Sequence, residues 1–205
     1  MNNNIHILGF AGSLRQGSLN HGLLRAAKEL LPIDTNLEIY DLSAIPLFNA
    51  DIKASGEPES VNKFKRRIKV ADALLIATPE YNYSIPGVLK NAIDWASYPL
   101  NRSPFNDKPL AIMGAGGRLG TLRAQLHLRD IAQHLNMHVL NNPEVMVARA
   151  WERFDQNGNL TDPETRQRIA KLLQALVDWT RRLKRPTPLE AHHSRGSYSL
   201  SAISN

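Results

Sequence analysis

The stretch ALLIATP, residues 73–79, is almost continuously apolar. Apolar runs of this length without alternation are typical of strands that are covered on both faces, as in the middle of a parallel sheet. Parallel neighbours need crossover connections, which are usually helices. The stretch therefore predicts an α/β protein, provided that strand and helix patterns alternate on either side of it.

Strand and helix patterns do alternate along the rest of the chain. Pro32 ends the first expected helix, Pro86 opens the third, and Thr161 with Glu164 has capping-box spacing before the last. The expected strands are 5–9, 37–42, 73–79, 109–117 and 137–147, and the expected helices are 23–31, 60–70, 86–95, 121–135 and a last one that ends by residue 185. Five such units predict a flavodoxin-like three-layer sandwich with a five-stranded parallel sheet in the order 2-1-3-4-5.

The composition is that of one globular domain. The 205 residues are 42% hydrophobic and 21% charged, and no apolar run approaches the roughly 20 residues of a membrane-spanning helix. We expect one domain over residues 1–185 and a flexible tail over 186–205, where periodicity is lost. Cysteine is absent, which excludes disulfides and thiolate nucleophiles, and we expect a cytoplasmic protein that does not contact membranes.

The net charge of +6 raises the question of nucleic acid. The basic residues fall into separate runs, Lys63–Lys69 and Arg181–Arg185, which is typical of solvated helix faces, so we expect no nucleic-acid partner. A basic surface would also attract a phosphorylated dinucleotide. His127, His134 and His138 lack a carboxylate that would complete a ligand set, and we predict no metal site.

The sequence GSLRQGSLN, residues 12–20, joins the first strand to the first helix. A helix start offers unpaired N–H groups and a partial positive charge, and Ser13, Arg15, Ser18 and Asn20 add donors, so this loop is suited to a phosphate. It has no lysine of a Walker A loop and no third glycine of a dinucleotide fingerprint. A serine-capped helix with a polar turn is the alternative reading.

Two further loops follow strands that the topology places beside the first strand. The sequence TPEYNYSIPGVLKNAIDW, residues 78–95, sets tyrosines among polar groups between two prolines, which suits a flat heterocycle. Local packing of those tyrosines is the alternative. Gly114–Gly117 ends the fourth strand and lets a ligand approach the backbone, although glycines there also suit a plain turn. Together the three loops predict a mononucleotide site, and the three tryptophans are expected in the core or at an interface.

The first two loops and the segment RAQLHLRDI, residues 123–131, resemble the NADPH-dependent FMN reductase family, which includes bacterial chromate and quinone reductases and azoreductases. The resemblance covers about residues 5–185. It implies an FMN phosphate at the first loop, the isoalloxazine at the second with Ser84 close by, and the pyrimidine end of the ring at the third. The implied cofactor-binding residues are Ser13, Arg15, Ser18, Asn20, Pro79, Glu80, Tyr81, Asn82, Ser84, Gly114, Ala115, Gly116 and Gly117.

The resemblance also implies the reaction. FMN would take two electrons by hydride transfer from NADPH or NADH and pass them, in a ping-pong sequence, to a quinone; azo compounds, chromate or free flavin would be further acceptors. No side chain is assigned as catalytic. Leu126 replaces a tyrosine found in some chromate-reducing relatives, which favours quinones over chromate. The alternative function is a flavin-binding electron carrier or redox-responsive module without turnover of NADPH.

Family members commonly form dimers or tetramers in which a neighbouring subunit reaches the flavin. The resemblance therefore implies a homodimer or homotetramer. Tyr83, Arg123 and the helix after Pro86 are the candidates for that contact or for contact with substrate.

Overall fold

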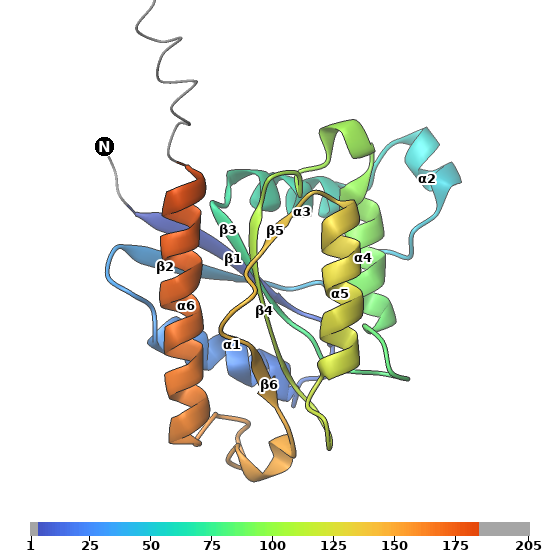
Figure 1. The fold of residues 1–205 in the computed structure, drawn as a ribbon. Helices are drawn as coiled ribbons and strands as arrows, with labels where there is room; N and C mark the ends of the chain where they lie inside the picture. Colours follow the sequence, from blue (N-terminus) through green and yellow to red (C-terminus); the bar gives the residue numbers. More distant parts are fainter. Residues whose placement is uncertain (1–3, 185–205) are drawn as a thin grey trace, which may run out of the picture.

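A computed structural model of the chain describes residues 4–184 (Figure 1). The strands are β1 (Ile5–Ala11), β2 (Thr35–Tyr40), β3 (Ala73–Ala77), β4 (Pro109–Ala115), β5 (His138–Val139) and β6 (Val145–Val147). The helices are α1 (Leu19–Glu29), α2 (Ala50–Ser55), α3 (Glu59–Val70), α4 (Gly87–Ser97), α5 (Leu122–His134) and α6 (Pro163–Leu183), with short 3-10 turns η1 (Leu100–Arg102) and η2 (Ala150–Glu152).

The sheet is parallel and has the order β2-β1-β3-β4-β5, as the sequence predicts, with β6 added beside β4. All of β3 is buried, in agreement with a strand covered on both faces. The helices α1 and α6 pack on one face of the sheet, and α3, α4 and α5 pack on the other (Figure 1). Two separate apolar cores result, which confirms the three-layer flavodoxin-like sandwich.

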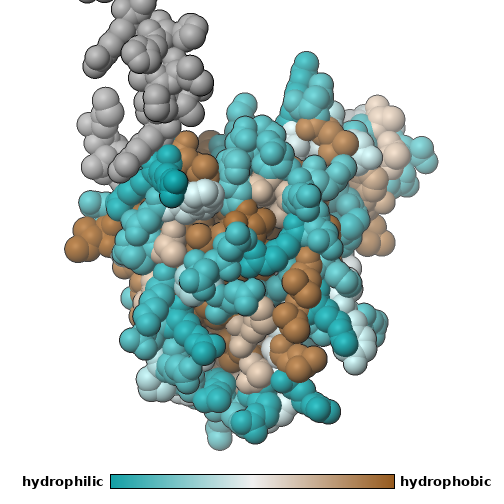
Figure 2. All heavy atoms as spheres, viewed as in Figure 1, coloured by the Kyte–Doolittle hydropathy of each residue, from teal (hydrophilic) through white to brown (hydrophobic). Residues whose placement is uncertain are grey.

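The outer surface is polar where helices face solvent. The face seen in Figure 2 is mostly hydrophilic, with apolar groups in separate patches. No helix within residues 4–184 combines the length and the hydrophobicity needed to cross a membrane. The predicted tail at 186–205 lies outside the described residues.

The predicted strand at 137–147 is wrong as a single element. Its two ends both pair with β4, His138 opposite Pro109 and Val145 opposite Met113, and the residues between them leave the sheet. Pro143 has no N–H to donate to a ladder, which favours a loop there. The connection at 46–58 also contains the short helix α2, which the turn-rich sequence does not predict.

The order of the strands sets the carboxyl ends of β1, β3 and β4 side by side. The N–H of Gly12 donates to the carbonyl of Ala77 at 2.9 Å, and the N–H of Thr78 donates to that of Met113 at 2.9 Å. These bonds continue the sheet pairing into the loops. The three predicted loops therefore leave the sheet at one edge.

Candidate functional site

A cleft of about 240 Å³ lies at this edge of the sheet. Its lining comes from all three predicted loops and from one further segment: Ser13, Arg15, Ser18, Leu19, Asn20, Pro79, Glu80, Tyr81, Ala115, Gly116, Gly117, Ala150 and Trp151. Most of the predicted binding residues are in this list. Asn82, Ser84 and Gly114 are not.

The first loop places the N-terminal end of α1 in the lining of the cleft. Ser18 is the N-cap residue of α1, but its side chain makes no capping hydrogen bond. The first N–H groups of a helix have no partner within the helix, so those of α1 and the Ser18 hydroxyl are available to a ligand. Ser13 and Ser18 are only 4% and 5% exposed. The Arg15 guanidinium lies over the loop, donates to the carbonyl of Gly17 at 3.3 Å, and is exposed.

Asn20 joins the first loop to the third. Its side-chain amide donates to the carbonyl of Ala115 at 3.0 Å and accepts from the N–H of Ala115 at 3.0 Å. The residue is 3% exposed. Each amide atom has capacity for one more bond, but the paired geometry makes Asn20 first of all a clamp between β4 and α1.

Glu80 joins the second loop to α5. One oxygen of its carboxylate accepts from the N–H groups of Arg123 at 2.9 Å and Ala124 at 3.1 Å. These N–H groups lie in the first turn of α5, where no intrahelical partner is available and a negative charge is favoured. Glu80 thus acts as a capping group supplied from another part of the chain, and it fixes the second loop against α5.

Residues 81–84 form a tight hairpin beyond Glu80. Tyr81 and Ser84 exchange two backbone hydrogen bonds of 3.0 Å, and both central residues have positive φ, 50° at Asn82 and 63° at Tyr83. Asparagine is frequent in such turns, whereas tyrosine there is strained. The hairpin places Tyr81 in the cleft and turns Asn82 and Ser84 away from its lining.

The first two turns of α5 hold this hairpin from outside. The guanidinium of Arg123 lies 3.7 Å from the centre of the Tyr83 ring. The Ser84 hydroxyl is 2.9 Å from Nδ1 of His127, one turn farther along. Tyr83 and Arg123, the predicted interface pair, are therefore in contact within one subunit, and both side chains also face solvent.

The three glycines of the third loop have different surroundings. A Cβ on Gly114 would collide with Thr121 and with the carbonyl of Thr78, and one on Gly116 would collide with the carbonyl of Gly120. Nothing lies within 4 Å of a Cβ on Gly117. Gly114 and Gly116 are therefore needed by the fold, and Gly117 gives the open approach to the backbone.

The sequence does not predict three residues of the lining, Leu19, Ala150 and Trp151, of which Trp151 has the largest side chain. Trp151 is 63% exposed and lies in η2, beside the third loop. Core or interface placement is the usual expectation for tryptophan, and no local pattern marks Trp151 as different. Its proximity to the cleft depends on β6, which pairs with the end of β4 and brings the following residues back to the site.

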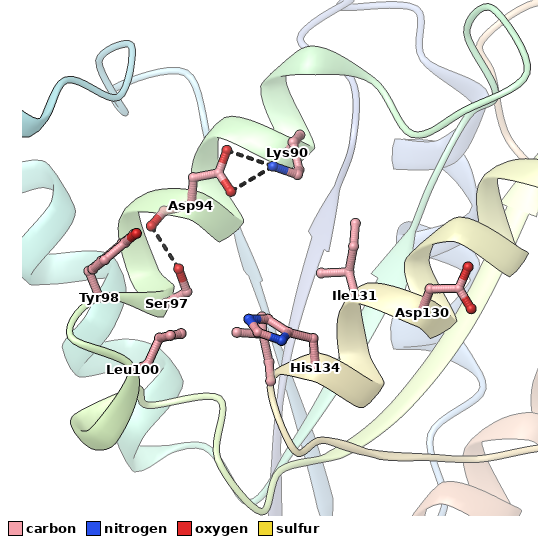
Figure 3. A pocket seen from close by; sticks show the side chains of 9 residues that line it. Lys90, Asp94, Ser97, Tyr98, Leu100, Asp130, Ile131 and His134 are labelled. Carbon is pink, nitrogen blue, oxygen red and sulfur yellow. Dashed lines mark hydrogen bonds and ion pairs between the residues drawn. The ribbon is translucent and has the colours of Figure 1, made fainter.

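A second and larger cavity, of about 420 Å³, lies between α4 and α5 (Figure 3). Figure 3 shows Lys90 paired with Asp94 on α4, and Ile131 and His134 on α5 facing the same space. Leu100 and Tyr98 close one end, and both are substantially exposed. This groove does not contain the predicted binding loops.

Comparisons with known proteins show which family the chain belongs to. Residues 5–152 match the family described as NADPH-dependent FMN reductase. The chain is 52% identical over 185 residues to an NAD(P)H-dependent FMN reductase of Pseudomonas aeruginosa, covering 90% of this chain and 100% of that protein. It is 44% identical over 186 residues to an NAD(P)H:quinone oxidoreductase of Solanum tuberosum, covering 88% of this chain and 95% of that protein.

A solved structure has the same fold. The flavoenzyme FerB of Paracoccus denitrificans, an NAD(P)H:(acceptor) oxidoreductase, superimposes with a TM-score of 0.79 at 34% identity, over 87% of this chain and 98% of that one. These matches confirm the family and the fold that the sequence predicts. The chain belongs to the NADPH-dependent FMN reductase family, a family of enzymes named for its flavin, FMN, and for its electron donor, NADPH.

Proposed function

We propose that the cleft binds FMN and that the chain transfers two electrons from NADPH or NADH to a quinone. The observation that carries the proposal is the convergence of three loops on one cleft, with a helix N-terminus at one end and an open glycine at the other. The names of the relatives from Pseudomonas and Solanum support the flavin and the acceptor class. Azo compounds, chromate and free flavin are further candidate acceptors.

The residues present fit a phosphorylated flavin. Ser13, Ser18 and Arg15 would hold the phosphate, since two hydroxyls that are nearly buried and a guanidinium surround the N-terminus of α1. Pro79 and Tyr81 would lie along the ring, and Asn82 and Ser84 would act from the hairpin just outside the lining. Gly117 offers backbone to the pyrimidine end without a Cβ in the way.

Held by Ser13, Arg15 and Ser18, FMN would supply the two-electron chemistry of a ping-pong exchange between the reduced nicotinamide and the acceptor. The chain holds the site rigid for this exchange. Asn20 fixes the first loop to the third, and Glu80 fixes the second loop to α5, so the three loops keep one spacing. Backbone N–H groups around Gly117 would stabilise negative charge that develops at the ring edge they face. No side chain is required as a general acid, because water can protonate a released hydroquinone.

We also propose a homodimer or homotetramer in which the groove between α4 and α5 receives a second copy of the chain. Leu126 is 49% exposed and lies on α5 one turn before Asp130, which lines the groove, and Tyr98 and Leu100 of the lining are exposed as well. Apolar surface of this kind is stabilised by burial. A cytoplasmic location stays a prediction from the cysteine-free sequence.

The substitution Arg15→Ala tests the cofactor site. Loss of a hydrogen-bonded charge at the phosphate should weaken FMN binding by about 1.5–3 kcal/mol, roughly 10- to 150-fold in Kd. The measurement is quenching of flavin fluorescence on titration of the apoprotein. Riboflavin is the matched control ligand: it has no phosphate, so its affinity should be equal in wild type and variant.

Two results would contradict the proposal. Equal FMN affinity in wild type and Arg15→Ala would show that the first loop does not bind the phosphate. A holoprotein that binds FMN tightly but neither bleaches the flavin with NADPH or NADH nor reoxidises with a quinone would be an electron carrier.

A further inference from the structure

An indole lines one rim of the cleft, and two exposed arginines, Arg118 and Arg149, lie next in sequence to residues that line the cleft. Trp151 lines the cleft and is 63% exposed, although tryptophan is costly to leave in water. None of the roles assigned above to the flavin-binding loops uses it. An exposed aromatic face beside a ligand cleft is a ready stacking surface for a planar heterocycle.

The backbone fixes this rim firmly. Arg149 has the left-handed conformation, with φ 45°, and its N–H donates to the carbonyl of Gly117 at 2.8 Å. The N–H of Ala150 donates to the carbonyl of Gly116 at 3.0 Å. A left-handed arginine is strained, and such strain persists where the surrounding contacts require it. These bonds hold η2, and Trp151 with it, against the third loop.

The same bonds bring two arginines together. The N–H of Arg149 is bonded to the carbonyl of Gly117, and Arg118 is the next residue after Gly117, so the two arginines lie on adjoining backbone and both are exposed. Within residues 4–184, Arg118 forms no ion pair. Arg149 has one weak pair, 3.5 Å from Glu152, with both side chains largely exposed. The positive charge at this rim is therefore hardly neutralised.

We propose that Trp151, Arg118 and Arg149 form a subsite for the adenosine 2′-phosphate of NADPH; this rests on the proposed function. The purine would stack on the indole, and the phosphate dianion would be bound by the two guanidinium forks. NADH has the same purine and no 2′-phosphate. The rim therefore selects NADPH over NADH, and the selection comes from Arg118 and Arg149.

The decisive variant is Arg118→Ala combined with Arg149→Ala. It should raise the KM for NADPH by at least about tenfold, as expected when charged hydrogen bonds are lost, and lower the NADPH-to-NADH ratio of kcat/KM by a similar factor. The assay uses FMN-loaded protein and 1,4-benzoquinone. Arg66→Ala is the matched control, since Arg66 is an exposed arginine on α3, on the other face of the sheet; it should leave the ratio unchanged.

Inhibition by nucleotide fragments distinguishes binding of the purine from binding of the 2′-phosphate. Adenosine 2′,5′-bisphosphate should inhibit wild type competitively against NADPH and more strongly than 5′-AMP, and the double variant should lose this difference. Trp151→Leu should weaken both fragments, because both contain the purine.

Four outcomes would overturn the subsite. An unchanged NADPH-to-NADH ratio of kcat/KM in the double variant would show that the two arginines do not bind the 2′-phosphate. Equal rises in KM for NADPH and NADH would show that the arginines contact the pyrophosphate, which both nucleotides have. A fall in FMN affinity would show that the arginines bind the flavin. A wild type that prefers NADH would show that the rim does not select NADPH. Failure of the proposed function looks different: wild type loaded with FMN would then oxidise neither nucleotide.

Discussion

At the residue scale, two glycines of the same loop, Gly116 and Gly117, have different roles. Gly116 sits where a Cβ would meet the carbonyl of Gly120, a backbone group that cannot move alone, whereas a Cβ on Gly117 would enter open space. Gly117 also lines the cleft. A side chain at Gly116 should therefore destabilise the fold, whereas a side chain at Gly117 should affect only ligand binding in the cleft.

The pair Gly116→Ala and Gly117→Ala tests this difference. Overpacking should cost Gly116→Ala at least about 2 kcal/mol of unfolding free energy, or abolish folding. Gly117→Ala should stay within about 0.5 kcal/mol of wild type and bind FMN more weakly. Urea denaturation of the apoproteins, followed by fluorescence titration with FMN, measures both effects. Wild-type stability in Gly116→Ala would show that the third loop can rearrange.

The chemistry of individual site residues was predictable, but their partners were not. The sequence identifies Glu80 and Asn20 as polar groups in loops beside strand ends. Their bonds reach residues that are 43 and 95 positions away, at Arg123 and Ala115. Residue type is local information, whereas such pairings depend on the register of β1, β3 and β4. Both residues line the cleft, yet their observed bonds give them positioning roles that the resemblance does not imply.

At the scale of elements, the residues around a helix N-terminus decide which of them caps the helix. The spacing of Thr161 and Glu164 predicts a cap at Thr161, and this is wrong. The N-cap of α6 is Asp162, whose carboxylate accepts from the N–H of Thr165 at 2.8 Å and from its hydroxyl at 2.6 Å. Pro163 gives the reason: proline is favoured in the first helical position, so the residue before it is the cap.

The substitution Asp162→Ala should destabilise the protein by about 1 kcal/mol, the usual cost of a lost N-cap. Hydrogen bonds from Thr165 hold the pKa of the Asp162 carboxyl below its ordinary 3.8. A lowered pKa in the folded state means that this stabilisation is complete above pH 3.8 and is lost as the pH falls through the folded-state pKa. The difference between wild type and variant should therefore shrink in acid, as urea denaturation at neutral and low pH would measure.

Thr161→Ala is the matched control. The Thr161 hydroxyl donates to the carbonyl of Arg153 at 3.2 Å on the surface, and its removal should cost less than about 0.5 kcal/mol. If Thr161→Ala lost more stability than Asp162→Ala, the helix would be capped by Thr161 with Glu164 and not by Asp162.

At the scale of the whole molecule, sheet order determines which loops meet. The order 2-1-3-4-5 is the flavodoxin-like arrangement that five alternating β/α units predict, and it places the loops after β1, β3 and β4 at one edge. This is why the site could be predicted from three separate motifs. Trp151 could not, because the pattern of residues 137–147 predicts one strand where the fold has β5 and β6. A single strand would carry the chain past the site, whereas β6 begins again beside Met113 and returns η2 to it.

The whole molecule also has a face that the fold leaves uncovered. The groove between α4 and α5 is lined by Tyr98 and Leu100, both more than 40% exposed (Figure 3), and the exposed Leu126 lies on α5 one turn before Asp130, which also lines it. If a second copy covers it, Leu126→Glu should bury an unpaired charge in the interface and shift the protein to monomers. Ile33→Glu is the matched control. Ile33 is 88% exposed between α1 and β2, so the Ile33→Glu variant should have the same oligomeric state as wild type. Light scattering after size-exclusion chromatography, over a range of protein concentrations, measures the mass. A monomeric wild type, or an unchanged mass in Leu126→Glu, would show that this groove does not receive a second copy.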